Sequence, residues 1–372
     1  MSSMGIDRRH FLVGSVVTLA ACSRSWAADA APSAATFASA CRIEDGSYAI
    51  AFLDAGGRIV AEHPVASRAH DVAWSRGTGV AVAFARQPGR YAVAFSPRAG
   101  GREPLLFAPP DNRAFFGHGV FTPDGRLLYA TENDLDAGTG CIGIYDAGGS
   151  FARVGELPSG GIGPHELLLL DEGRKLAIAN GGYETLPETG RQPIDIAGMR
   201  PSLVFLDRLT GDIKAKHELP ETLRPLSIRH LAADRRGIVW FGGQWEGSPD
   251  ATPEIVGSAS PDRPLRLLQA GRPLGPLLKG YIGSVAMSHD GATLAVAAPR
   301  AGRTLLIDTD AGTLRAEVEL ADGCGIAATG DGFVLSSGHG RLLTHHDNGS
   351  DTTLADLPGT AFDNHLRWLA AV

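Results

Sequence analysis

The chain has 372 residues and a formal net charge of −7. A mildly acidic chain excludes a nucleic-acid-binding protein, because such proteins neutralise phosphates with clustered Lys and Arg. The 48 glycines and the scarcity of helix-periodic segments favour an all-β fold built from repeats.

The first 21 residues predict an export signal. Two arginines, Arg8 and Arg9, precede an apolar run that ends at Ala21 and is too short to span a bilayer. The paired arginines match the twin-arginine pattern, and the small residues before Cys22 match a lipoprotein cleavage site. We therefore expect residues 1–21 to be removed and Cys22 to be acylated, which gives a periplasmic lipoprotein tethered to the inner or outer membrane.

The next segment, residues 22–37, is rich in Ala, Ser and Pro and has no apolar periodicity, which predicts a tether. Apart from Cys22, the chain contains the cysteines Cys41, Cys141 and Cys324. An odd number of cysteines does not form a closed disulfide framework. We expect residues 38–372 to form one folded domain.

One pattern recurs six times in this domain: an apolar strand, a tight turn, and a second strand rich in Ala, Val and Leu. The copies begin at His70, His118, His165, His230, Ser284 and Gly325. Their separations of 48, 47, 65, 54 and 41 residues are near the ~40–50 residues of a four-stranded propeller blade. Pairs such as Asp124-Gly125 and Asp290-Gly291 supply the positive φ angles of hairpin turns.

The end of the chain, Asp363–Leu369, reads as one more strand of this type without a hairpin partner. The strands expected near Ser47–Leu53 and Arg58–His63 have no innermost strand of their own. We predict that the two ends of the chain complete a seventh blade, which hides both exposed sheet edges. The predicted fold is a seven-bladed β-propeller.

Five of the seven repeats carry a histidine at the same register of the innermost strand. These residues are His70, His118, His165, His230 and His365. Innermost strands line the channel of a propeller, so the five imidazoles are expected to converge on its axis. Neutral imidazoles bind iron, copper, zinc and nickel, so the pattern predicts a transition-metal site. A hydrogen-bonded plug of structural histidines is the alternative.

Other polar residues are expected at the same mouth of the channel. Glu132, Asp134 and Glu246 are candidates to orient the imidazoles or to complete a coordination sphere. Cys324 stands at the sixth register, where a thiolate ligand would favour copper. Arg229 and Arg300 are candidates to bind an anionic ligand.

A long insertion, Tyr183–Arg200, follows one of the second strands and is expected to form a lid over the mouth. The chain contains no G-x-S-x-G elbow, no phosphate-binding P-loop, no H-E-x-x-H motif and no C-x-x-C-H haem attachment. The sequence therefore lacks the motifs that identify the best-known hydrolases, P-loop nucleotide-binding proteins, zinc proteases and c-type haem proteins.

Several segments, in order, resemble the DUF1513 family of exported bacterial proteins. They are FGHGVFTPDG with ATEND, GIGPHELLLL with ANGG, SIRHLA with VWFGGQWEG, YIGSVA with APRAG, and DNHL. The resemblance implies a propeller but no established activity. Members are often encoded near imelysin-type and other iron-associated periplasmic proteins, which implies partners of that kind and a role in iron or other metal uptake.

The sequence hypothesis is therefore a periplasmic, lipid-anchored propeller that binds a transition metal, iron or copper, through the five histidines. Two alternatives stay open. One is a copper- or iron-dependent oxidoreductase that uses an open coordination position at the same site. The other is a protein-interaction scaffold whose histidines are structural.

Overall fold

The computed structural model describes residues 35–97, 103–185, 190 and 195–369. They belong to one compact unit, Ala34–Val372. The expected export signal, the acylation site at Cys22 and the tether up to residue 34 lie outside the described residues. None of the helices in the described part has the length and apolar character needed to cross a membrane.

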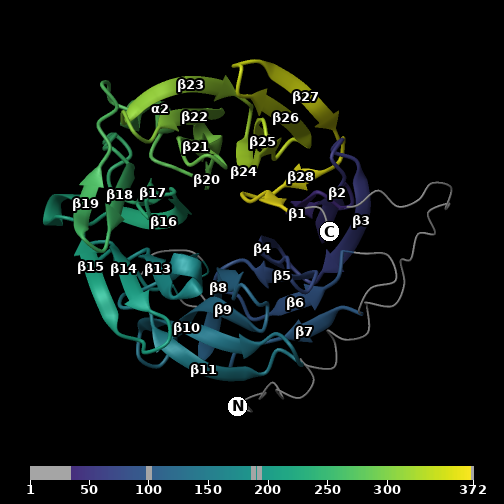
Figure 1. Cartoon of the computed structure of the whole chain (residues 1–372), viewed down its shortest axis with the longest axis vertical. Helices are drawn as coiled ribbons and strands as arrows, with labels where there is room; N and C mark the ends of the chain where they lie inside the picture. Colours follow the sequence, from purple (N-terminus) through teal and green to yellow (C-terminus); the bar gives the residue numbers. More distant parts are fainter. Residues whose placement is uncertain (1–34, 98–102, 186–189, 191–194, 370–372) are drawn as a thin grey trace, which may run out of the picture. The chain divides into compact units, whose positions relative to one another are not determined.

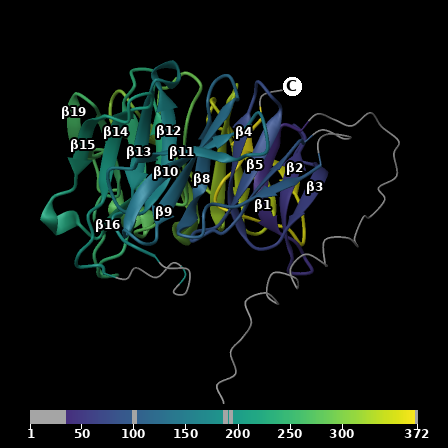
Figure 2. The same ribbon diagram turned by 90° about the horizontal axis from the view of Figure 1, so that it is seen from below.

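The described residues form seven antiparallel sheets arranged around a central axis (Figure 1). Figure 2 shows the same blades from the side. Six sheets each take four consecutive strands. From the axis outward these are β4 (Ala69–Ser75), β5 (Val80–Ala85), β6 (Ala92–Phe95) and β7 (Leu105–Phe107); β8 (Arg113–Phe121), β9 (Leu127–Asp134), β10 (Thr139–Asp146) and β11 (Arg153–Pro158); β12 (Pro164–Leu170), β13 (Lys175–Asn180), β14 (Ser202–Asp207) and β15 (Ile213–Glu218); β16 (Leu226–Ala233), β17 (Val239–Trp245), β18 (Val256–Ser260) and β19 (Arg263–Leu267); β20 (Ser284–Met287), β21 (Thr293–Ala298), β22 (Arg303–Asp308) and β23 (Thr313–Glu319); and β24 (Gly323–Thr329), β25 (Gly332–Ser337), β26 (Arg341–His346) and β27 (Asp351–Asp356). Short helical segments in the loops are η1 (Asp171–Gly173), η2 (Glu221–Leu223), α2 (Gly275–Leu278) and η3 (Pro299–Ala301).

The seventh sheet joins the two ends of the described chain. Its strands are β1 (Phe37–Arg42), β2 (Tyr48–Leu53) and β3 (Ile59–Val65) with β28 (Ala361–Phe362) and β29 (Arg367–Trp368). Both C-terminal strands pair with β1, through Cys41 opposite Phe362 and Ala38 opposite Arg367. The predicted seven-bladed propeller and its closure by both ends are confirmed.

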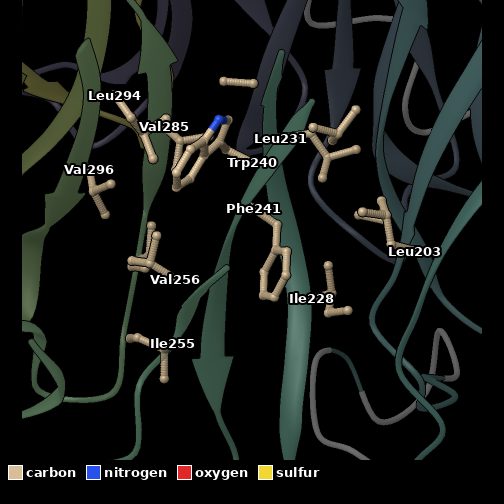
Figure 3. Packing of buried hydrophobic residues seen from close by; sticks show 14 of the residues in the cluster. Leu203, Ile228, Leu231, Trp240, Phe241, Ile255, Val256, Val285, Leu294 and Val296 are labelled. Carbon is tan, nitrogen blue, oxygen red and sulfur yellow. The ribbon is translucent and has the colours of Figure 1, made fainter. Parts of the chain in front are cut away.

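The hydrophobic core lies between neighbouring blades. Its largest cluster gathers side chains from three successive blades, including Leu203 on β14, Phe241 on β17 and Val296 on β21 (Figure 3). The outermost strands alternate between partly buried and exposed positions, as in β3, because only one of their faces meets a neighbour. The predicted Asp-Gly turns are present, with φ of 68° at Gly125 and 69° at Gly291. Apolar packing between blades thus holds the innermost strands in place around the axis.

Candidate metal centre

The innermost strands are bulged at the histidine register. Pairing with the second strand shifts between Ala69 and Val72 in β4, and between Phe115 and Gly119 in β8. It shifts again around His165 in β12, and around Arg229 in β16. A bulge leaves residues unpaired and changes the direction of their side chains. The repeated bulges therefore turn side chains toward the axis.

In β8 the bulge depends on a glycine. Gly117 has a φ of 102°, a conformation that L side chains rarely adopt. A Cβ atom there would lie 2.8 Å from Cδ2 of the His70 ring. Glycine at this position thus lets the His118 strand approach the imidazole of the preceding blade.

The five predicted histidines meet in one buried cluster. They come from five consecutive blades, namely the closing blade and those that begin with β4, β8, β12 and β16. Nine pairs of their rings have centroids 4.7–6.4 Å apart. Each residue is at most 3% exposed. The predicted convergence of the histidines on the axis is what the structure shows.

Buried carboxylates face the Nδ1 atoms of three of these rings. His118 Nδ1 lies 2.9 Å from Asp71 Oδ2, and His230 Nδ1 lies 3.3 Å from Glu166 Oε2. His70 Nδ1 lies 3.5 Å from Asp363 Oδ1, an ion-pair distance without hydrogen-bond geometry. A neutral imidazole that donates Nδ1–H to a carboxylate turns its Nε2 lone pair the other way, toward the cluster.

One arginine joins these carboxylates to each other. Arg367 Nε and Nη2 donate to the two oxygens of Asp71, each at 2.6 Å, and Nη2 also donates to Glu166 Oε1 at 3.1 Å. Two negative charges thus face one positive charge next to the imidazoles. The remaining negative charge favours a bound cation.

Most of the nitrogen atoms in the cluster have no partner. Six buried ring nitrogens lack a hydrogen bond: Nδ1 and Nε2 of His70, Nε2 of His118, Nδ1 of His165, Nε2 of His230 and Nε2 of His365. A buried polar atom without a partner costs ~1–3 kcal/mol. Native proteins rarely contain several together unless a ligand satisfies them.

The spacing of these atoms suits a metal ion. Ligand atoms of His70, His118 and His365 lie within 4.8 Å of one another, as do those of His118, His165 and His230. His118 belongs to both groups. An imidazole nitrogen binds a transition metal at ~2.0–2.1 Å, so small movements would bring either group onto one ion. The residues present therefore fit a metal.

Electrostatics keep the cluster in the form that binds metal. Burial lowers the pKa of His70 to about 3 and that of His230 to about 4. Burial also lowers the pKa values of His165 and His365. These four imidazoles are neutral at neutral pH, and a neutral imidazole is the metal ligand.

The carboxylates behind the rings are ionised despite their burial. Burial acts most strongly on Asp71 and would raise its pKa, but the charge of Arg367 and its other partners hold the pKa well below the usual range. In Glu166 burial is again opposed, here by His118, His230 and Arg367, and the pKa falls to about 2. Ionised carboxylates at this position increase the basicity of the imidazoles.

The predicted acidic partners have other contacts. Glu132 accepts hydrogen bonds from Tyr145 and Arg153 inside the β8–β11 blade. Asp134 accepts from the backbone of its own turn and pairs with Arg113. We expected both to orient imidazoles, but the structure does not bring either of them to the histidines. Both lie on a second strand, one strand spacing farther from the axis than the innermost strand.

Two other predicted residues also lie apart from the rings. The Cys324 thiol, at the bulge of β24, faces the carbonyl oxygens of Ser336, Phe362 and Asp363. Burial raises the pKa of this thiol, which opposes the thiolate form. Arg300 stacks on the ring of Tyr281, with Cζ 4.3 Å from the centroid.

Arg229 and Glu246 form a pair beside the cluster. Arg229 is buried immediately before His230, and its Nη2 lies 3.8 Å from Glu246 Oε1. Much of the expected lid, residues 186–189 and 191–194, lies outside the described residues, and the first residue of the insertion, Tyr183, covers Arg229.

Sequence reasoning missed the residues that support the rings: Asp71, Glu166, Asp363 and Arg367. A signal was present, because Asp71 and Glu166 directly follow His70 and His165. In a regular strand adjacent side chains point to opposite faces, which argues against such pairs. The bulges cancel that alternation.

Comparisons with known proteins agree with the fold. A family model described as "Protein of unknown function (DUF1513)" matches residues 63–369. No curated protein matches the chain. Among solved structures, the chain is similar to the periplasmic gluconolactonase PpgL of Pseudomonas aeruginosa, with 15% identity over 91% of this chain and 100% of that chain and a TM-score of 0.60. It is also similar to Kuenenia stuttgartiensis hydrazine synthase, with 12% identity over 90% of this chain and 98% of that chain and a TM-score of 0.57. At these identities the likeness shows the propeller fold only.

Proposed function

The chain belongs to the DUF1513 family, and we propose that it binds a single transition-metal ion on the propeller axis. The ligands are drawn from His70, His118, His165, His230 and His365. The observation that carries this proposal is the set of six buried ring nitrogens without a hydrogen-bond partner.

A hydrogen-bonded plug of structural histidines does not account for these six unpaired ring nitrogens. Such a plug would satisfy its own nitrogens, because each buried orphan costs ~1–3 kcal/mol. Here the Nδ1 atoms of His118 and His230 face carboxylates, whereas their Nε2 atoms face the cluster unpaired. This polarity is the arrangement of metal-bound histidines in proteins.

Iron is the leading metal in this proposal and copper the runner-up. Imidazole nitrogens suit both ions. The Cys324 thiol, which would have favoured copper, hydrogen-bonds to backbone carbonyl oxygens instead. The association of the family with iron-related periplasmic proteins adds weight to iron.

We further propose that the protein acts in the periplasm as a lipoprotein anchored through Cys22. The Arg8-Arg9 signal and the small residues before Cys22 support this location. A twin-arginine route carries folded proteins, so a site assembled from five blades would be loaded before export. Imelysin-type proteins of metal uptake are the proposed partners.

Holding or carrying the metal is favoured over turnover. All five imidazoles are at most 3% exposed, so a substrate would reach the metal only after the blades or loops had moved. The alternative, a copper- or iron-dependent oxidoreductase at the same site, requires such an opening. Bound metal with no redox turnover towards dyes or thiols supports carriage, and metal-dependent turnover supports the oxidoreductase.

Elemental analysis tests the proposal directly. The mature protein is purified from the periplasm, together with the double variant His118→Ala, His165→Ala. We expect about one metal ion per wild-type chain and a loss of most of that metal in the double variant, because His118 belongs to both groups of ligand atoms. The matched control is His346→Ala, a partly exposed histidine bonded to Asp331 and Thr352, which should keep its metal. A wild-type protein that stays without metal after exposure to Fe²⁺, Cu²⁺, Zn²⁺ and Ni²⁺ would refute the proposal.

A further inference from the structure

Arg229 is a buried cation with unused hydrogen-bond donors. The side chain is 1% exposed, at the bulge of β16 between Ile228 and His230. Its Nη1 donates to Gln87 Oε1 at 3.1 Å, but Nε and Nη2 have no hydrogen-bond partner. Arg229 pairs with Glu246, whereas Asp71 and Glu166 pair with Arg367, so Arg229 stands outside the ion pairs that support the rings.

The charge of Arg229 is only partly balanced. The Glu246 carboxylate lies 3.8 Å from Nη2, beyond hydrogen-bond distance, and its side chain is 26% exposed. The ring of Tyr183 covers a face of the guanidinium, with its centroid 4.9 Å from Cζ. A guanidinium stays protonated in proteins, and burying its charge is costly unless acceptors surround it. The uncovered edge, Nε–H and Nη2–H, therefore needs an anion.

A glycine lies against this edge. A Cβ atom at Gly181 would lie 2.8 Å from Ser227 Oγ and 3.7 Å from Arg229 Nε. Ser227 is buried, and its hydroxyl also has no partner. The backbone carbonyl oxygen of Gly163 is the third neighbour of this position, at 3.3 Å. Two unpartnered donors thus border Gly181, and no side chain from this residue covers them.

We propose that a carboxylate-bearing ligand binds there, accepting hydrogen bonds from Arg229 Nε–H and Nη2–H and from the Ser227 hydroxyl. The two parallel N–H groups of a guanidinium match the two oxygens of a planar carboxylate. The bound carboxylate adjoins the histidine cluster, since Arg229 directly precedes His230. This inference goes beyond metal binding and does not depend on a bound metal.

Calorimetric titration with formate, the smallest carboxylate, tests the site on the full mature chain. Metal is removed with 1,10-phenanthroline, which carries no carboxylate, and the titration is repeated on metal-loaded protein. We expect one formate per chain in both forms, and weaker binding of phosphate, because phosphate is larger than formate and brings more charge to a buried site. Arg229→Gln should weaken formate binding at least tenfold. The control Arg300→Gln, which removes an arginine that stacks on Tyr281, should leave binding unchanged.

Two further variants keep the test valid if Arg229→Gln does not fold. Gly181→Ala places a methyl group against the Ser227 hydroxyl and beside Arg229 Nε, with Arg229 intact, so formate binding should fall at least tenfold. Glu246→Gln removes a competing negative charge, so binding should tighten severalfold. The proposal is overturned if the wild-type protein binds phosphate only, or neither anion. It is also overturned if the affinity for formate is equal in wild type and Gly181→Ala. Formate binding by a chain that never takes up metal would refute the metal site and leave this inference standing.

Discussion

Two buried polar networks in this propeller differ in one respect. In the β8–β11 blade, Glu132 accepts hydrogen bonds from Tyr145 Oη and from Arg153 Nε and Nη2, and no buried side-chain nitrogen or oxygen of these three residues lacks a partner. On the axis, five histidines leave six nitrogens unpaired. Both networks contain buried carboxylates paired with an arginine, so completeness of hydrogen bonding is what separates a structural network from a candidate ligand site. The following predictions test that distinction.

The largest expected effect is acid destabilisation of the metal-free protein by the axial network. The folded pKa values of His70 and His230, about 3 and about 4, lie below the ordinary value of 6.5. The unfolded chain therefore binds more protons between these limits, and the free energy of unfolding falls as pH falls from about 6.5 to about 4. Each such imidazole contributes up to ~1.4 kcal/mol per pH unit.

Urea unfolding between pH 7.5 and 4.5 measures this slope. Burial raises the pKa of Glu132 above the ordinary value of 4.5, so this residue affects stability in the opposite direction. Its contribution to the free energy of unfolding grows as pH falls toward 4.5. His165→Gln should make the acid slope shallower, because it removes one imidazole that the fold keeps neutral. An unchanged slope in this variant would contradict the assignment of the acid sensitivity to the axis.

The network of Glu132, Tyr145 and Arg153 should contribute to the stability of the fold and not to metal binding. Glu132→Ala leaves the buried Tyr145 hydroxyl without its acceptor and Arg153 with Glu156 alone, and a buried polar group without a partner costs ~1–3 kcal/mol. Thermal or urea unfolding should show this loss, while the metal content stays at the wild-type level. The control is Glu156→Ala, which removes the exposed partner of the same arginine and should cost less than about 1 kcal/mol. Loss of metal in Glu132→Ala at a temperature where the variant is folded would contradict this separation.

Asp71→Asn should weaken metal binding. The carboxylate orients His118 and pairs with Arg367, and loss of such a partner typically lowers metal affinity ~10–100-fold. Competition with a chromogenic chelator measures the change. Asp134→Asn, a carboxylate in a turn, is the matched control and should have wild-type affinity. Equal effects of the two substitutions would place Asp71 outside the site.

The smallest effect is expected at Cys324. Its thiol faces backbone carbonyl oxygens, and its raised pKa makes it a poor ligand. Cys324→Ala should cost on the order of 1 kcal/mol in stability and leave metal content unchanged. A fall in metal content in this variant would restore the thiolate hypothesis.

Much of the architecture was predictable from the sequence because it repeats. Regular spacing and Asp-Gly turns indicated the blades, and an unpaired strand at His365 indicated closure. The convergence of the five histidines followed from their common register.

The supporting residues were not predictable by the same logic. Asp71 neighbours a histidine in sequence, and only a bulge brings both to the axis. The expectation that Glu132 orients the imidazoles misled for a different reason. The end of a second strand fixes the height of a residue along the axis and not its distance from the axis. Local backbone irregularity and radial position are properties of the folded ring.

The closing blade has a consequence for how the axial cluster forms. His365 and Arg367 lie in or beside the short strands that pair with β1 and close the ring. The cluster therefore lacks one of its histidines, and the arginine that joins Asp71 to Glu166, until β28 and β29 have reached β1. Closure of the ring and completion of the cluster are thus a single step of folding.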